Sequence, residues 1–102
     1  MALYERSPVV DEDWQSIVDY TFDEYGEDQV RKYTKGLLKC MDSMAQGEGH
    51  FKDKKVLQRT VRIKHCHKHY IFGVIKPDAP MLVIAIFHER MELMKRLGNR
   101  LK

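Results

Sequence analysis

The chain has 102 residues, of which 43% are hydrophobic and 32% are charged, a composition typical of one soluble globular domain. No apolar run approaches the roughly 18 residues that cross a membrane, and no basic and then apolar leader opens the chain. These features exclude an integral membrane protein and favour a cytoplasmic one. The two cysteines lack the dense spacing of a secreted scaffold, so we expect Cys40 and Cys66 to be free thiols.

The net charge of +3 conceals an uneven distribution along the chain. Residues 1–30 carry nine acidic side chains and one basic side chain, whereas residues 31–102 carry six acidic and seventeen basic ones and all five histidines. This asymmetry indicates an anionic partner for the later elements, either nucleic acid or an acidic protein segment. A charged, solvated surface without any such partner would leave the same pattern.

The first elements are an extended lead-in and a helix. Residues 3–10 are short and contain Pro8, which suits an edge strand or an extended segment. Asp11 can cap a helix whose apolar side chains recur at helical spacing as far as Tyr25. Gly26 can end this helix with a positive φ.

A second helix follows almost at once and runs to Gly47 and Gly49, with its basic residues outside the apolar stripe. A link of two residues predicts an antiparallel helical hairpin whose apolar stripes share one surface. Gly36 in the middle of this helix predicts close packing, because glycine there costs on the order of 1 kcal/mol relative to alanine.

The second half of the chain favours β-structure. A basic loop over 47–55 leads to two predicted strands, 56–64 and 69–76, and the proline-rich turn 77–80 leads to a third over 81–87. That last run is apolar throughout, so we expect a strand buried on both faces.

His88 ends the last predicted strand, and residues 89–102 form a basic amphipathic helix. The predicted order is therefore β-α-α-β-β-β-α. A single α+β domain over 1–102, with a mainly antiparallel sheet and the helical hairpin on one face, follows from this order.

The segment His65-Cys66-His67-Lys68-His69 contains side chains that bind zinc and copper. On a strand, His65, His67 and His69 would point one way and Cys66 the other, and no second ligand pair completes a site. We therefore expect a solvated β-turn, no metal and no cofactor.

Basic side chains of the predicted sheet could bind phosphates, namely Arg59, Arg62 and Lys64. His88 would lie at the edge of the same face, where it could be structural, contact a partner or move protons near neutral pH. The chain lacks a glycine-rich phosphate loop, a GxSxG motif and a carboxylate pair placed for acid and base catalysis.

Taken in order, several short segments resemble the ParE/RelE superfamily of bacterial type II toxins over about residues 7–97. The opening pattern of the family is similar to Ser7-Pro8, Trp14, Ile17, Tyr20, Tyr25-Gly26 and Tyr33. The middle pattern is similar to Val61-Arg62-Ile63 and His69-Tyr70-Ile71-Phe72. The closing pattern of the ParE branch matches His88-Glu89-Arg90-Met91-Glu92-Leu93. The chain departs from the family at Gly73, where tyrosine is common, and at Gly47-Glu48-Gly49, which replaces a proline-containing loop.

The resemblance implies a toxin whose small sheet is clasped by a helical hairpin and which is held inactive, in a hetero-oligomer, by a cognate antitoxin with an acidic, flexible segment. ParE-type members act on DNA gyrase and stop replication without being enzymes. RelE-type members cleave messenger RNA in the ribosomal A site.

No tyrosine follows His88, and an amphipathic helix takes the place of the short aromatic tail of nuclease members. We therefore interpret the chain as a gyrase-inhibiting toxin. The residues predicted to contact its partners are Arg59, Arg62, Lys64, His88, Arg90, Arg96 and Arg100. The alternative is an endoribonuclease that uses Arg59, Arg62, Lys64 and His88, and a third hypothesis is a regulatory nucleic-acid-binding module.

Overall fold

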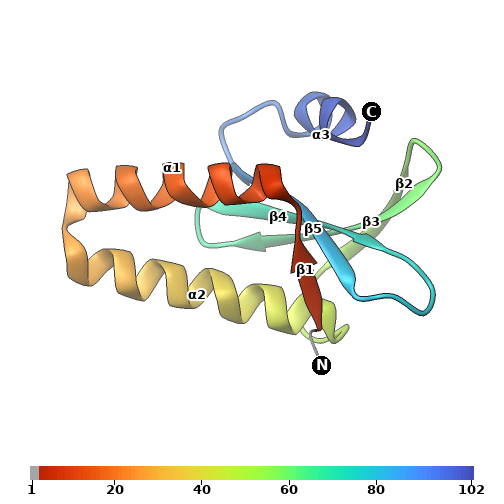
Figure 1. The fold of residues 1–102 in the computed structure, drawn as a ribbon, viewed down its shortest axis with the longest axis horizontal. Coiled ribbons are helices and arrows are strands. Elements are labelled where there is room, and N and C mark those ends of the chain that lie inside the picture. The colour runs from red at the N-terminus through yellow and green to blue at the C-terminus, as the bar shows by residue number, and fades with distance from the viewer. Residues whose placement is uncertain (1–2) are drawn as a thin grey trace.

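The computed structural model describes residues 3–102, which form a five-stranded sheet and three helices (Figure 1). The strands lie in the order β1-β5-β4-β3-β2, with β1 parallel to β5 and every other pair antiparallel. This arrangement confirms the predicted α+β class and its mainly antiparallel sheet. The elements in chain order are β1 (Tyr4–Arg6), α1 (Pro8–Tyr25), α2 (Glu27–Ala45), β2 (Lys52–Val56), β3 (Arg59–Cys66), β4 (His69–Ile75), β5 (Met81–His88) and α3 (Leu93–Leu101).

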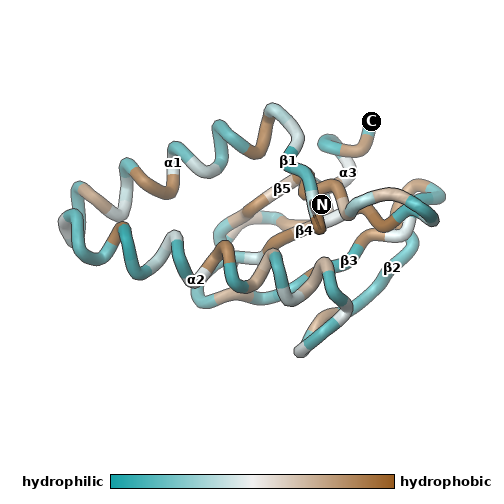
Figure 2. Tube along the Cα trace, turned by 60° about the horizontal axis from the view of Figure 1, so that its bottom comes forward, coloured by the Kyte–Doolittle hydropathy of each residue, from teal (hydrophilic) through white to brown (hydrophobic). Residues whose placement is uncertain are grey.

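The sheet lies between two layers of helix, and each of its faces has its own hydrophobic core. The hairpin of α1 and α2 covers one face, where Ile17, Leu37 and Met41 pack against Ile71 of β4 and Val83 of β5. Helix α3 covers the other face, where its buried apolar side chains meet Val61, Phe72 and Val74. Figure 2 shows the hydrophobic stretches of β4 and β5 in the middle of the molecule and the polar β2 at the outside.

The helical hairpin extends past the sheet, so that the turn joining α1 and α2 projects from the body of the molecule (Figure 1). Gly26 forms this turn with a φ of 86°, as its position in the sequence predicts. Because the far end of the hairpin has no sheet beneath it, the large side chains of Tyr20, Phe22 and Tyr25 are exposed.

The first helix begins earlier than the sequence predicts, because Ser7 and not Asp11 occupies the N-cap position. Pro8 starts the helix, where its fixed φ suits helical geometry and its missing N–H costs nothing. The extended lead-in is therefore only β1, and Asp11 lies in the first helical turn.

The predicted basic loop over 47–55 contains a strand, and this prediction was wrong. Strand β2 consists of three exposed lysines, an exposed aspartate and the partly buried Val56, so it carries almost no hydrophobic signal and is defined by its pairing with β3. Leu57 and Gln58 form the connecting two-residue turn with positive φ values of 50° and 66°, which glycine or asparagine would ordinarily mark in a sequence.

The last two elements differ slightly from their predicted bounds. His88 is the last residue of β5, one position beyond the predicted bounds 81–87, and it pairs with His69 of the neighbouring strand β4. Helix α3 is shorter than the predicted 89–102, because residues 89–92 form the connection between the end of β5 and the helix.

Cys40 and Cys66 form a disulfide, which contradicts the prediction of two free thiols. Helix α2 crosses the β3–β4 turn and places the two Cα atoms 6.4 Å apart, within the usual range for a disulfide. The same helix face brings Gly36 against the ring of His67, whose Nε2 atom lies 2.8 Å from the position of an added Cβ. The close packing predicted at Gly36 is thereby confirmed.

Replacing Gly73 with alanine is expected to lower the free energy of unfolding by about 2 kcal/mol, because a new methyl group would overpack the core. Gly73 lies at an irregularity of the β4–β5 ladder, and an added Cβ would stand 2.6 Å from the Sδ atom of the buried Met81. Urea unfolding of the variant measures this loss. Recovery of stability in a Gly73→Ala/Met81→Ala double variant, relative to Met81→Ala alone, is the control, and an unchanged Gly73→Ala single variant would contradict the prediction.

Candidate functional site

A cleft lies between helix α1, the start of helix α2 and the end of strand β5. It consists of two adjoining cavities of about 440 and 370 Å³. Arg96 and Arg100 lie at its α3 end, and Tyr25 and Tyr33 lie at its hairpin end. The side chains that line both cavities are Tyr20, Thr21, His69, His88 and Arg90.

The antiparallel register brings the two histidines of the cleft together. His69 begins β4 and His88 ends β5, so the two residues are opposite each other at one end of the sheet. Their rings are 5.3 Å apart and nearly perpendicular. Both histidines lie on the face of the sheet that the helical hairpin covers, because Ile71 and Ile86, two residues away on each strand, belong to the core beneath the hairpin.

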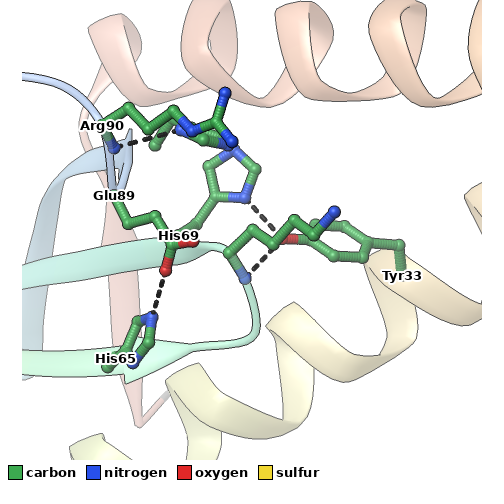
Figure 3. A network of polar contacts seen from close by, with 7 residues as sticks. Tyr33, His65, His69, Glu89 and Arg90 are labelled. Atoms are coloured by element: carbon green, nitrogen blue, oxygen red, sulfur yellow. Dashed lines mark hydrogen bonds and ion pairs between the residues drawn. The ribbon is translucent and has the colours of Figure 1, made fainter.

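Tyr33 fixes the orientation of His69 (Figure 3). The phenolic oxygen of Tyr33 accepts a hydrogen bond from the backbone N–H of Lys68 at 3.2 Å and is hydrogen-bonded to Nδ1 of His69. Burial, and secondarily the neighbouring charge of His88, lowers the pKa of His69 from its ordinary 6.5 to about 4, and the charge of Glu89 opposes these effects. His69 is therefore a neutral imidazole at physiological pH.

His88 is held by the backbone that follows it. The N–H of Arg90 donates to Nδ1 of His88 at 3.1 Å. Glu89 points to the other side, where its carboxylate lies 2.9 Å from Nε2 of His65. The segment after β5 thus orients His88, and the exposed side chain of Arg90 lines both cavities.

Lowering the pH from 7 to 5 is expected to cost the protein about 2 kcal/mol of stability through His69. In this range the unfolded chain takes up a proton at a histidine of ordinary pKa, whereas folded His69, with a pKa of about 4, does not. Stability from this group is therefore complete above pH 6.5 and is lost as the pH falls towards 4. Urea unfolding at both pH values measures the effect, and His69→Gln should lose this part of the pH dependence. An equal dependence in the variant would contradict the assignment.

Three of the seven residues predicted to contact partners lie together at the cleft, namely His88, Arg90 and Arg96. Arg100 also borders it, but its guanidinium group is bound to Asp13 at 2.8 and 3.0 Å and to the carbonyl oxygen of Ile84. Arg100 therefore joins α3 to α1 and has little capacity left for a partner.

The other three predicted residues do not join this group. Arg59 lies at the opposite end of the sheet, because β3 begins beside the end of β4. Arg62 forms a hydrogen-bonded ion pair with Asp53, which lowers the pKa of that carboxyl group, and it also donates to the carbonyl oxygen of Met44. Lys64 donates to the carbonyl oxygen of His50. The residues of the endoribonuclease alternative are thus not assembled into one site.

Sequence reasoning missed His69, Tyr33, Tyr20 and Tyr25 as parts of the cleft. The sequence did contain a signal for His69, because a two-residue turn at His67 and Lys68 makes His69 the first residue of β4. The first residue of β4 lies opposite His88 at the end of β5. The tyrosines gave no such signal, because their place on a helical stripe does not distinguish a cleft wall from a core.

The turn predicted in the histidine-rich segment is confirmed, with His67 and Lys68 exposed between β3 and β4. Within residues 3–102, no cluster of three or more His, Cys, Asp or Glu side chains could hold a metal ion. Over the same range, every helix is too short or too polar to span a membrane.

Comparison with known proteins identifies one family. The model of the ParE toxin of the type II toxin-antitoxin system parDE matches residues 4–93. The chain is also similar to the Escherichia coli protein named Toxin ParE, with 41% identity over 102 residues that cover 100% of this chain and 99% of that protein. The match to the family model includes both histidines of the cleft and Arg90.

Proposed function

This chain belongs to the ParE family, the toxins of parDE type II toxin-antitoxin systems, and from that premise we propose that it stops growth by inhibiting DNA gyrase. Family membership also implies a cognate antitoxin as its partner. The observation that carries the proposal is the similarity over the whole chain to a protein named Toxin ParE.

The geometry supports a binding protein more than a nuclease. Arg62 and Lys64 hold β3 to its neighbours, Arg59 lies at the far end of the sheet, and only His88 of that set faces the cleft. A ribonuclease needs its acid, base and phosphate-binding groups within reach of one phosphodiester. We therefore assign growth arrest to binding at the target and not to RNA cleavage by this set.

Arg90 and Arg96 are the cationic groups of the cleft best suited to a protein partner. Both are exposed, and among residues 3–102 neither guanidinium group makes an ion pair or a side-chain hydrogen bond. We propose that the antitoxin covers this surface with an acidic, flexible segment in a hetero-oligomer, which would explain the excess of basic residues after position 30. On this proposal, both the antitoxin and DNA gyrase bind the toxin in the cytoplasm.

The test is expression of the chain from a tightly controlled promoter in bacteria, with DNA and protein synthesis followed separately by pulse labelling. Gyrase inhibition predicts that DNA synthesis falls first and that gyrase becomes trapped on cleaved DNA. An earlier fall in translation, with messenger RNA cut at codons, would overturn the proposal in favour of the nuclease. Continued growth with salt-sensitive nucleic-acid binding by the purified protein would instead support a binding module.

The Arg90→Glu/Arg96→Glu double variant is expected to lose growth arrest while keeping the circular dichroism spectrum of the folded protein. Lys76→Glu is the control for a charge reversal elsewhere on the surface, because this exposed lysine follows β4 at the end of the sheet away from the cleft. The control should remain toxic. Full toxicity of a folded double variant would exclude these arginines from the target contact.

A further inference from the structure

The hydrogen bonds around His69 and His88 determine which ring atom each histidine offers to the cleft. The Nδ1 atom of His88 accepts the backbone N–H of Arg90, so in the neutral ring the proton is on Nε2. The Tyr33 oxygen already accepts the Lys68 N–H, and its own O–H has the lone pair of His69 Nδ1 as acceptor. We assign to His69 the same tautomer, in which the Tyr33 O–H donates to Nδ1 and the ring proton is on Nε2.

Both Nε2–H groups are free to donate. Neither makes a hydrogen bond within residues 3–102, and neither is among the fully buried side-chain polar atoms left without a partner. Both histidines line both cavities of the cleft. Arg90 lines the same two cavities, and its guanidinium group adds further donors.

We propose that His69, His88 and Arg90 form a carboxylate-binding site, in which an aspartate or glutamate side chain of a peptide accepts hydrogen bonds from the two Nε2–H groups and the guanidinium. This inference deepens the proposed function and rests on it for the source of the peptide, which is the acidic segment of the antitoxin. A carboxylate suits the site because it has only acceptors to offer and these three groups have only donors.

The surroundings favour a carboxylate on a peptide over the phosphates of a nucleic acid. The cationic side chains of the cleft that make no ion pair within residues 3–102 are isolated ones, Lys68, Arg90 and Arg96, whereas a nucleic acid carries one charge per nucleotide along its whole length. Between the polar groups the walls are apolar or aromatic, with Ile86, Phe87 and Tyr20 among them. Such a cleft suits a peptide with isolated acidic residues among apolar ones, whose apolar side chains gain from burial.

Tyr33 is a positioning residue in this site. It reaches the cleft from the second helix and, by donating to Nδ1, keeps the proton of His69 on the nitrogen that faces the ligand. Without the phenolic hydroxyl, the proton of His69 can move to Nδ1, and the Nε2 lone pair would then repel a carboxylate. The hydroxyl therefore influences binding without touching the ligand.

The experiment uses the full chain labelled with nitrogen-15 in its histidines and follows the ring nitrogens by NMR. The probe is a capped twelve-residue peptide in which two glutamates alternate with leucine, alanine and serine, and a second peptide has glutamine in place of both glutamates. The Nε2–H signals of His69 and His88 should shift on adding the glutamate peptide. The glutamine peptide should bind about tenfold more weakly, as expected for the loss of hydrogen bonds to a charged group.

Three variants test the roles assigned. Tyr33→Phe should move the proton of free His69 partly to Nδ1, a change visible in the ring spectrum without any peptide, and should weaken binding. His88→Leu should abolish the difference between the two peptides. His50→Gln changes an exposed histidine in the loop after α2 and should behave as the wild type.

Equal binding of the two peptides, or Nε2 signals that do not move, would overturn the site. Inorganic phosphate or a short single-stranded RNA that shifts the same signals more strongly than the glutamate peptide would overturn its assignment to a peptide carboxylate. These results do not depend on growth arrest. If the protein inhibits gyrase but does not bind the glutamate peptide, the carboxylate site is refuted and the gyrase proposal stands. If it binds the peptide but is not toxic, only the gyrase proposal is refuted.

Discussion

Replacing Arg100 with methionine is expected to lower the free energy of unfolding by about 3 kcal/mol, because the change leaves a largely buried carboxylate without its counter-charge. The side chains of Arg100 and Asp13 are 20% and 15% exposed, and their two hydrogen bonds measure 2.8 and 3.0 Å. The substitution also leaves the carbonyl oxygen of Ile84 without a partner. Methionine retains most of the aliphatic packing, so the loss reports on the charge and the hydrogen bonds.

Urea unfolding at pH 7 measures this effect, and the Asp13→Asn/Arg100→Met double variant is the control. In this double variant Asp13→Asn removes the unpaired negative charge, which should recover part of the lost stability. The asparagine amide oxygen can still accept the hydrogen bond from the backbone N–H of Ile86. A loss below about 1 kcal/mol in the single variant would mean that water reaches the pair and that it behaves as a surface ion pair.

The Asp13–Arg100 pair also links the two helical layers to the cleft. Asp13 projects from α1 and Arg100 lies in the last turn of α3, and the Asp13 carboxylate also accepts a hydrogen bond from the backbone N–H of Ile86 in β5. Arg96 stands one turn before Arg100 on the same helix. The pair therefore positions the α3 wall of the cleft, and its loss should weaken partner binding as well as stability.

The elements that the sequence predicts well are those whose hydrophobic pattern agrees with their environment. Helix α1 shows a helical repeat because one side rests on the sheet, and β5 is apolar throughout because both of its faces are covered. Strand β2 shows no such hydrophobic pattern, since it lies at the sheet edge and exposes four of its five residues. Only its hydrogen bonds to β3 define β2 as a strand, and the residue types of β2 do not predict that backbone pairing.

The site was predicted in part for a related reason. His88, Arg90 and Arg96 are close in sequence to a recognisable strand end, and local pattern is enough to group them. His69 and Tyr33 enter the cleft from two other elements, through strand register and the crossing of α2 over the β3–β4 turn. Arg62 and Lys64 were predicted as partner contacts from their charge, but their internal hydrogen bonds depend on tertiary structure.

Reduction of the Cys40–Cys66 disulfide is expected to lower the free energy of unfolding by about 3.5 kcal/mol. The disulfide joins residues separated by 26 positions, and opening a loop of this length returns that much conformational entropy to the unfolded chain. Urea unfolding with and without dithiothreitol measures the difference. The Cys40→Ala/Cys66→Ala variant should be insensitive to the reductant, and a stability that does not change in the wild type would contradict the prediction.

The consequence of reduction should extend to the cleft, because the disulfide shares its helix face with the contact that orients His69. Tyr33, Gly36 and Cys40 follow one another at helical spacing along α2 and meet His69, His67 and Cys66 across the β3–β4 turn. Opening the covalent link leaves only the glycine contact and the Tyr33 hydrogen bonds to hold this part of the helix. Hydrogen exchange of the amides around position 36 should therefore accelerate on reduction. Unchanged exchange there, with stability reduced as expected, would mean that the disulfide acts on the unfolded chain alone.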